Sequence, residues 1–198
     1  MSGARPGKRV VLLRGMPGVG KTTLARNIAK ELGYPLIVKD DVRDVLHRLE
    51  SRVSTGMLFL DGSPARLDTN ADSYDVMYLV ARTQLECGLN VIVESPLGTH
   101  ERYVRFCKLA EDFGATPFLL DCTMDLESWK RRLRNRFEQG TEPAHKPHDP
   151  EAILDYYKDQ LKYPSDRGPS ISLDMDKKKK QSVDALSRQA VRWLSQSD

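Results

Sequence analysis

Gly15-Met16-Pro17-Gly18-Val19-Gly20-Lys21-Thr22 fits the phosphate-binding pattern G-x-x-x-x-G-K-[ST] at every fixed position. Its glycines allow the backbone to wrap phosphates closely, with successive N–H groups pointing inward where a Cβ would obstruct some of the turns. Lys21 adds a positive charge, and Thr22 offers the hydroxyl expected to bind Mg²⁺. The helix that follows presents its unpaired N–H groups and its dipole to the anion. The stretch therefore predicts a nucleoside triphosphate site.

Both flanks of this loop have the context that the motif requires. Residues 10–13 form a continuous apolar run, as expected for a strand that is buried on both faces. Apolar residues then recur at helical spacing over 24–32, and Gly33 closes this segment as a C-terminal cap would. We include Thr23 among the residues expected at the nucleotide, although its simplest role is in the helix. The nucleotide-binding set is Gly15, Met16, Pro17, Gly18, Val19, Gly20, Lys21, Thr22 and Thr23.

Length and composition describe a soluble globular protein. A chain of 198 residues with 39% hydrophobic and 30% charged side chains is typical of one domain, which we assign to residues 1–198. No apolar run is long enough to span a bilayer, so no membrane partner is expected. Residues 1–8 lack the apolar core of a signal peptide and are predicted to form a flexible basic tail. These features favour a cytoplasmic protein.

Cysteine usage and charge narrow the class further. Cys87, Cys107 and Cys122 are odd in number and widely spaced, without a C-x-x-C pair, which argues against a disulfide framework and against a zinc site. A net charge of +3 permits an anionic ligand and is too small to require nucleic acid.

Strands and helices alternate along the rest of the chain. Apolar runs predict strands at 35–38, 89–94 and 116–120, and an alternating run predicts a fifth at 170–174. Right-handed crossovers would place the intervening helices on both faces of a parallel sheet. With the phosphate loop, this predicts the α/β fold of the P-loop NTPases, a three-layer sandwich with a five-stranded parallel sheet. We expect the strand order 2-3-1-4-5 and a small lid at about residues 132–150.

Carboxylates follow two of the predicted strands. Asp40 and Asp41 come directly after the second strand, where one could cap the next helix while the other faces a substrate. Glu94 ends the third strand, a position where a carboxylate, usually Asp, commonly orders the Mg²⁺ shell or the attacking group. For Glu94 we favour contact with metal or substrate over a purely structural role. Ligands bind at the carboxyl ends of strands in such sheets, so these acids share an edge with the phosphate loop.

A predicted helix from residue 126 carries five cations within seven residues. Arg132 and Arg136 lie on one of its faces, and Lys130 and Arg134 lie on another. Arginine donors can stabilise the charge that phosphoryl transfer spreads over oxygens, which favours a functional role for Arg132 and Arg136. For Lys130, Arg131 and Arg134 we prefer a solvated cationic surface.

Three segments show little of the apolar periodicity that is typical of helices or strands. Residues 51–70 form an irregular excursion that either closes over an acceptor or packs as a surface loop. Residues 140–150 are rich in Pro and His, and we favour a flexible lid over a metal site at His145 and His148 because no further ligands surround them. The lysines at 177–180 are interpreted as a solvated charge run, with contact to nucleotide as the alternative.

The combination of the phosphate loop, Asp40-x-x-Arg43, Glu94 and the Arg132–Arg136 pair resembles the broad family of small P-loop kinases. This family includes the kinase domain of polynucleotide kinases and chloramphenicol phosphotransferase. The resemblance covers roughly residues 9–194, and the phosphate loop is its one motif of high specificity. Residues 39–43, which read KDDVR, look much like the corresponding stretch of phage polynucleotide kinase.

That resemblance implies roles for individual residues. Asp40 would be the general base for the acceptor hydroxyl, and Arg43 would bind an acceptor phosphate. Arg132 or Arg136 would clamp the γ-phosphate from the lid, or stack on adenine instead. The implied catalytic residues are Lys21, Asp40, Arg132 and Arg136; the implied acceptor contacts are Asp40, Arg43 and Glu94; and the implied metal ligands are Thr22 and Glu94.

The expected activity is that of an ATP- and Mg²⁺-dependent phosphotransferase whose acceptor is an alcohol group of a small molecule or nucleotide. Asp40 and Arg43 favour the alternative of a 5′-hydroxyl polynucleotide kinase. Against it, the sequence has no basic tract with interleaved aromatic residues for binding nucleic acid. A nucleotide-driven switch without an acceptor is the third alternative, although the N-K-x-D and L-S-G-G-Q motifs are absent. The acceptor, the choice between Asp40 and Asp41, the choice between Arg132 and Arg136, the donor triphosphate and the oligomeric state stay open at this point.

Overall fold

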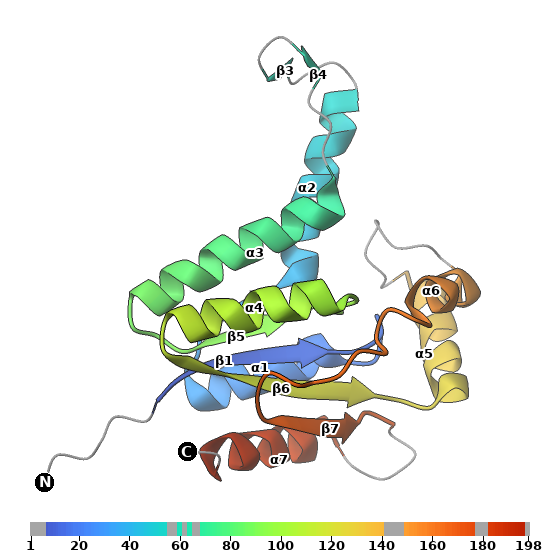
Figure 1. Ribbon diagram of the computed structural model, residues 1–198. Helices are drawn as coiled ribbons and strands as arrows, with labels where there is room; N and C mark the ends of the chain where they lie inside the picture. The colour runs from blue at the N-terminus through green and yellow to red at the C-terminus, as the bar shows by residue number, and fades with distance from the viewer. Residues whose placement is uncertain are drawn as a thin grey trace, which may run out of the picture.

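Five strands pair in parallel at the centre of the molecule (Figure 1). The structure, a computed structural model, describes residues 7–54, 59–60, 63–64, 68–140, 149–176 and 182–196. The order of the strands is β2-β5-β1-β6-β7, which confirms the predicted order 2-3-1-4-5. The strands are β1 (Lys8–Arg14), β2 (Leu36–Val38), β5 (Val91–Glu94), β6 (Ala115–Thr123) and β7 (Ser170–Asp174).

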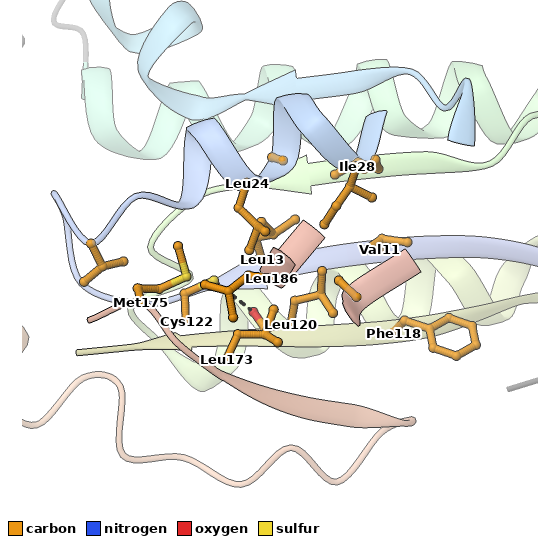
Figure 2. Packing of buried hydrophobic residues seen from close by; sticks show 14 of the residues in the cluster. Val11, Leu13, Leu24, Ile28, Phe118, Leu120, Cys122, Leu173, Met175 and Leu186 are labelled. Carbon is orange, nitrogen blue, oxygen red and sulfur yellow. Dashed lines mark hydrogen bonds between the residues drawn. The ribbon is translucent and has the colours of Figure 1, made fainter. Parts of the chain in front are cut away.

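Helices cover both faces of this sheet, as the three-layer prediction requires. Successive residues of β1 point to opposite faces, and its four apolar residues are fully buried. Val11 and Leu13 pack with residues of α1 and α7 (Figure 2), and Val10 and Leu12 pack with residues of α3 and α4. The helices are α1 (Lys21–Leu32), α2 (Lys39–Ser54), α3 (Thr69–Glu86), α4 (His100–Asp112), α5 (Leu126–Glu138), α6 (Pro150–Tyr157) and α7 (Val183–Gln196).

The ends of two helices bear on the site. Gly33 ends α1 with φ 69°, and its N–H donates to the carbonyl of Ala29, so the predicted glycine cap is confirmed. Helix α2 begins at Lys39, directly after β2, so Asp40 and Asp41 lie in its first turn rather than ahead of it. The expectation that one of them is the N-cap is therefore wrong. In the first turn both carboxylates still favour the positive end of the helix dipole.

Several predicted boundaries shift. Strand β1 begins at Lys8, the last residue of the predicted tail, and β6 continues past residue 120, where it pairs with both β1 and β7. Residues 132–138 of the predicted lid region belong to α5, and residues 141–148 lie outside the described residues. Helix periodicity explains this, because Trp129 and Leu133 continue an apolar stripe that is buried. His145, His148 and the lysines at 177–180 lie outside the described residues.

The predicted excursion at 51–70 contains regular structure at both ends. Its first residues complete α2, and its last two begin α3. Between them lie two short antiparallel strands, β3 (Phe59–Leu60) and β4 (Ser63–Pro64), at the far end of α2 and α3 in Figure 1. Within the described ranges, no helix is both long and apolar enough to cross a bilayer.

Candidate active site

Residues 15–20 connect β1 to α1, and their conformation requires glycine at defined points. Gly15 has φ 145°, and a Cβ there would lie 2.3 Å from the carbonyl oxygen of Cys122 on β6. Gly18 has φ 80°, and a Cβ there would lie 2.5 Å from Cδ2 of Leu133 on α5. An L side chain is therefore excluded at both positions by backbone conformation and by space. The loop is shaped by the two elements packed against it as well as by its own sequence.

Lys21 is buried and lies across the phosphate loop. Its Nζ donates hydrogen bonds of 3.0 Å to the carbonyls of Gly15 and Met16. The same Nζ lies 3.8 Å from Oε1 of Glu94, which is also buried. A buried charge needs partners of this kind, and these three belong to the loop and to β5. The ammonium group is thus held where a phosphate could replace the carbonyls as its partner.

Glu94 joins the loop to the neighbouring strands. It ends β5, which lies between β1 and β2, and its register partners are Leu13 and Val38. Its Oε2 accepts a hydrogen bond of 3.0 Å from the hydroxyl of Thr22. A hydroxyl and a carboxylate side by side fit Mg²⁺, which takes oxygen ligands and is commonly held by few protein groups together with phosphates and water. The described residues hold no cluster of three or more His, Cys, Asp and Glu side chains that could bind a metal by themselves.

A cleft of about 330 Å³ brings most of the predicted residues together. The phosphate loop and the start of α1 form one wall, and the first turn of α2 forms another. Asp40 and Asp41 both line the cleft, whereas Gly15, Met16, Val19 and Arg43 do not. The predicted residues that line it are Pro17, Gly18, Gly20, Lys21, Thr22, Thr23, Asp40, Glu94, Arg132 and Arg136.

Sequence reasoning missed five residues of this cleft, namely Arg26, Val38, Lys39, Asp44 and Pro96. Arg26 and Asp44 lie one turn beyond predicted residues on α1 and α2, so helical spacing could have indicated them. Nothing in the sequence distinguished Lys39, which is buried and donates a 2.8 Å hydrogen bond to Oδ1 of Asn70 on α3.

The two favoured arginines of α5 reach the cleft from the side of the loop. Nη2 of Arg132 lies 3.1 Å from the position that a Cβ of Gly20 would occupy, and Nη1 of Arg136 lies 3.8 Å from that of Gly18. Burial lowers the pKa of Arg132, and the positive charge of Arg136 lowers it further. The repulsion between these two positive charges beside the phosphate loop would be reduced by an anion that binds between them.

The other cations of α5 differ in their surroundings. Nζ of Lys130 forms a 2.8 Å ion pair with Glu151 on α6, so the prediction of a solvated side chain is wrong for Lys130. Arg131 is exposed and donates a 3.2 Å hydrogen bond to the hydroxyl of Ser128. Arg134 is exposed, as predicted.

An anchor that the sequence did not indicate fixes α5 to the loop. Nε1 of Trp129 donates a 2.7 Å hydrogen bond to the carbonyl of Pro17, 112 residues away in sequence, and both groups are buried. Trp129 shares its helix face with Leu133, which packs against Gly18. Sequence periodicity predicted Trp129 only as an apolar residue, because a contact over this separation leaves no local signal.

A second cavity of about 330 Å³ lies beside the cleft and shares Arg132 and Arg136 with it. It runs along α5 toward the end of β7, where Asp176 is buried and accepts a 3.3 Å hydrogen bond from the Ser128 hydroxyl. Its mixed apolar and polar lining is suited to a nucleobase and ribose. The remaining lining residues are Met124, Ser128, Arg131, Asn135, Gln139 and Asp176.

Solved structures share this fold over nearly the whole chain. A protein from Chloroflexus aurantiacus j-10-fl that is provisionally named a kinase has a TM-score of 0.74 and 21% identity, covering 96% of this chain and 98% of that one. A gluconokinase from Sinorhizobium meliloti 1021 has a TM-score of 0.62 and 18% identity, covering 96% and 93%. The Mycobacterium tuberculosis APS kinase CysC, in complex with AMPPNP and APS, has a TM-score of 0.60 and 18% identity, covering 96% and 99%.

No protein of curated function matches the sequence significantly. A family model, that of the AAA_33 AAA domain, matches residues 10–164, which include the phosphate loop, Glu94 and the arginines of α5. This match spans most of the chain and the whole of the cleft described above. The chain therefore belongs to this AAA domain family, as a P-loop protein with the fold of the small kinases.

Proposed function

We propose that this protein is an ATP- and Mg²⁺-dependent kinase that transfers the γ-phosphate to a hydroxyl group of a small molecule or nucleotide. One observation carries the proposal. The same cleft is lined by Lys21 and Thr22 from the start of α1 and by Asp40 from the first turn of α2. The kinase names of proteins with the same fold support the same class of reaction.

The donor would bind along the loop and into the second cavity. Lys21 and the backbone N–H groups of residues 18–22 would hold the β- and γ-phosphates. Lys21 would exchange its bonds to Gly15 and Met16 for phosphate oxygens, which requires little movement because those carbonyls belong to the loop itself. Asp176, Ser128 and Asn135 would face the nucleoside.

Thr22 and Glu94 would hold Mg²⁺. When bound, the ion neutralises charge on the phosphates and orients them. Their side chains already lie 3.0 Å apart, so ligation would replace one hydrogen bond without reorganising the strand. Burial of Glu94 keeps this carboxylate in a single place beneath the nucleotide.

Transfer would proceed in one displacement. The acceptor hydroxyl gives its proton to Asp40 as its oxygen bonds to the γ-phosphorus, and the bond from that phosphorus to the β,γ-bridging oxygen breaks to release ADP. Arg132 and Arg136 would stabilise the negative charge on the transferring group. Asp41 also lines the cleft and is the alternative base.

The proposal is tested by incubating the protein with ATP and Mg²⁺ against a set of hydroxylated metabolites and single-stranded oligonucleotides, with mass gain of the acceptor as the readout. We expect a gain of one phosphoryl group on a small molecule or nucleotide, and none with Lys21→Ala. Gain on oligonucleotides alone would instead identify a polynucleotide kinase. ATP hydrolysis that no acceptor changes would indicate a nucleotide switch and contradict the proposal.

A further inference from the structure

Two side-chain atoms near the cleft are buried and lack a hydrogen-bond partner within the described part of the chain. They are Nε of Arg43, on α2, and Oε1 of Gln160, just beyond α6. One is a donor and the other an acceptor. Leaving such atoms unpaired destabilises a folded protein, so they are expected to acquire partners from elsewhere.

The residues that carry both atoms lie near residues that line the cleft, although neither lines it itself. Arg43 follows Asp40 by three residues on α2, which places the two side chains on one face of the helix. Gln160 and Tyr157 both approach Gly98, two residues after the cleft residue Pro96. Burial raises the pKa of Tyr157, and Arg43 and Asp40 are among the charges that act on it, so both lie within electrostatic range of this ring.

Gly98 leaves room for the Gln160 carboxamide. A Cβ at Gly98 would lie 2.7 Å from Oε1 of Gln160 and 3.2 Å from Cε1 of Tyr157. The backbone before it is strained, because the buried Leu97 has φ 47°. The hydroxyl of Tyr163 donates a hydrogen bond to the Leu97 carbonyl and holds this turn in place.

Two arginines, Arg43 on α2 and Arg102 on α4, lie within electrostatic range of Asp68, which precedes α3. Arg43 and Arg102 both act on Asp68, whose pKa is lowered chiefly by the backbone N–H of Ala71 and further by these two arginines. The guanidinium of Arg102 lies 4.3 Å from the centre of the Tyr74 ring. Because Asp68 is exposed, its charge is largely screened, and it does not neutralise a guanidinium whose Nε is buried.

We propose that Arg43 and Gln160 form the recognition end of the acceptor site and select a small hydroxylated anion. An anionic oxygen, from a carboxylate or a phosphate ester, would accept from Nε of Arg43, and a second hydroxyl or amino group would donate to Oε1 of Gln160. This inference rests on the proposed function, because it takes the phosphorylated hydroxyl to lie at Asp40. It adds the class of acceptor and assigns specificity to Gln160.

The first test needs no acceptor. If the two atoms stay unpaired until a ligand binds, they destabilise the ligand-free protein. Gln160→Met and Arg43→Met should therefore each raise Tm by about 2–4 °C. Gln84→Met on α3 and Arg48→Met on α2 are matched controls and should leave Tm near that of the wild type. A fall in Tm, or no rise beyond the controls, would show that Arg43 and Gln160 are ordinary structural residues and overturn the inference.

The second test probes the anion directly. The protein is saturated with AMPPNP and Mg²⁺, so that the phosphate loop is filled, and inorganic phosphate is added at constant ionic strength. We expect phosphate to raise Tm further in the wild type and in Arg48→Met, and not in Arg43→Met. If AMPPNP raises Tm but phosphate adds nothing, the acceptor inference is wrong and the donor site stands.

If AMPPNP itself gives no shift, the proposed function fails, and the acceptor inference falls with it. A 5′-hydroxyl oligonucleotide that raises Tm where phosphate does not would assign the site to nucleic acid and overturn selection of a small anion. The Tm shifts with D-glycerate and with glycerol 3-phosphate, each compared with glycerol, distinguish a carboxylate from a phosphate ester as the bound anion. Equal shifts with glycerol and both anions would also overturn the inference.

Discussion

The hydroxyl of Thr22 donates a 3.0 Å hydrogen bond to one oxygen of Glu94, and Nζ of Lys21 lies 3.8 Å from the other oxygen. Two consecutive residues at the start of α1 are thus joined to a single carboxylate on β5. Asp is the usual residue at the end of this strand in P-loop proteins, and here the longer Glu reaches both partners.

Glu94→Gln should preserve the fold and impair the use of Mg²⁺. The amide can still accept from Thr22, but it carries no charge for the metal or for Lys21. We expect ATP turnover to fall by about 100-fold or more, with a higher Mg²⁺ concentration needed for half-maximal rate. A Mg²⁺ titration of turnover checks this, with Glu94→Asp as the variant that keeps the charge. Unchanged Mg²⁺ dependence in Glu94→Gln would remove Glu94 from the metal site.

Trp129→Phe should loosen the phosphate loop. It leaves the buried carbonyl of Pro17 without its 2.7 Å hydrogen bond, which costs about 1–3 kcal/mol of folding stability. Nucleotide affinity should fall as well, because the loop loses its link to α5. Denaturant unfolding and AMPPNP binding measure the two effects. Trp193→Phe, at a ring that meets Phe118 edge-on away from the loop, should leave affinity unchanged; equal losses in both variants would contradict the prediction.

Gly18→Ala should abolish nucleotide binding. The new methyl group would lie 2.5 Å from Leu133, and φ at this position is 80°. Gly33→Ala is the control for backbone strain alone. Gly33 also has a positive φ, of 69°, but has open space around it. The control should lose about 1–2 kcal/mol of stability while still binding AMPPNP. If Gly18→Ala binds as tightly as Gly33→Ala, the loop does not need its observed shape.

The three cysteines should differ sharply in reactivity. Burial raises the pKa of Cys107 to about 11 and that of Cys122 to about 12, so both thiols stay protonated and unreactive at pH 8. Cys87 is exposed. A maleimide at pH 8 should therefore label Cys87 alone in the native protein and all three after denaturation, as read by mass spectrometry. Rapid native labelling of Cys122, behind Gly15, would contradict the packing of β6 on the loop.

The donor half of the site could be predicted from the sequence because its signals are local. The spacing of residues 15–22, the buried strand before them and the helix after them are all contained in about two dozen consecutive residues. Asp40 and Glu94 could be placed because the ends of parallel strands meet at one edge, and the cleft confirms that they do. Arg132 and Arg136 could be separated from Lys130 by helical phase alone.

Contacts between distant segments could not be predicted. The bond from Trp129 to Pro17 and the approach of Gln160 to Gly98 depend on how α5 and α6 pack against the end of the sheet. The ion pair between Lys130 and Glu151, which joins α5 to α6, is another contact of this kind.

Single-turnover phosphorylation of the acceptor found by mass gain measures whether Asp40 accepts the proton of the acceptor hydroxyl. Asp40→Asn should bind AMPPNP like the wild type and transfer phosphate about 100 to 10,000 times more slowly. Asp41→Asn, the neighbouring carboxylate on the same cleft wall, should transfer at close to the wild-type rate. Near-normal transfer by Asp40→Asn would contradict the account.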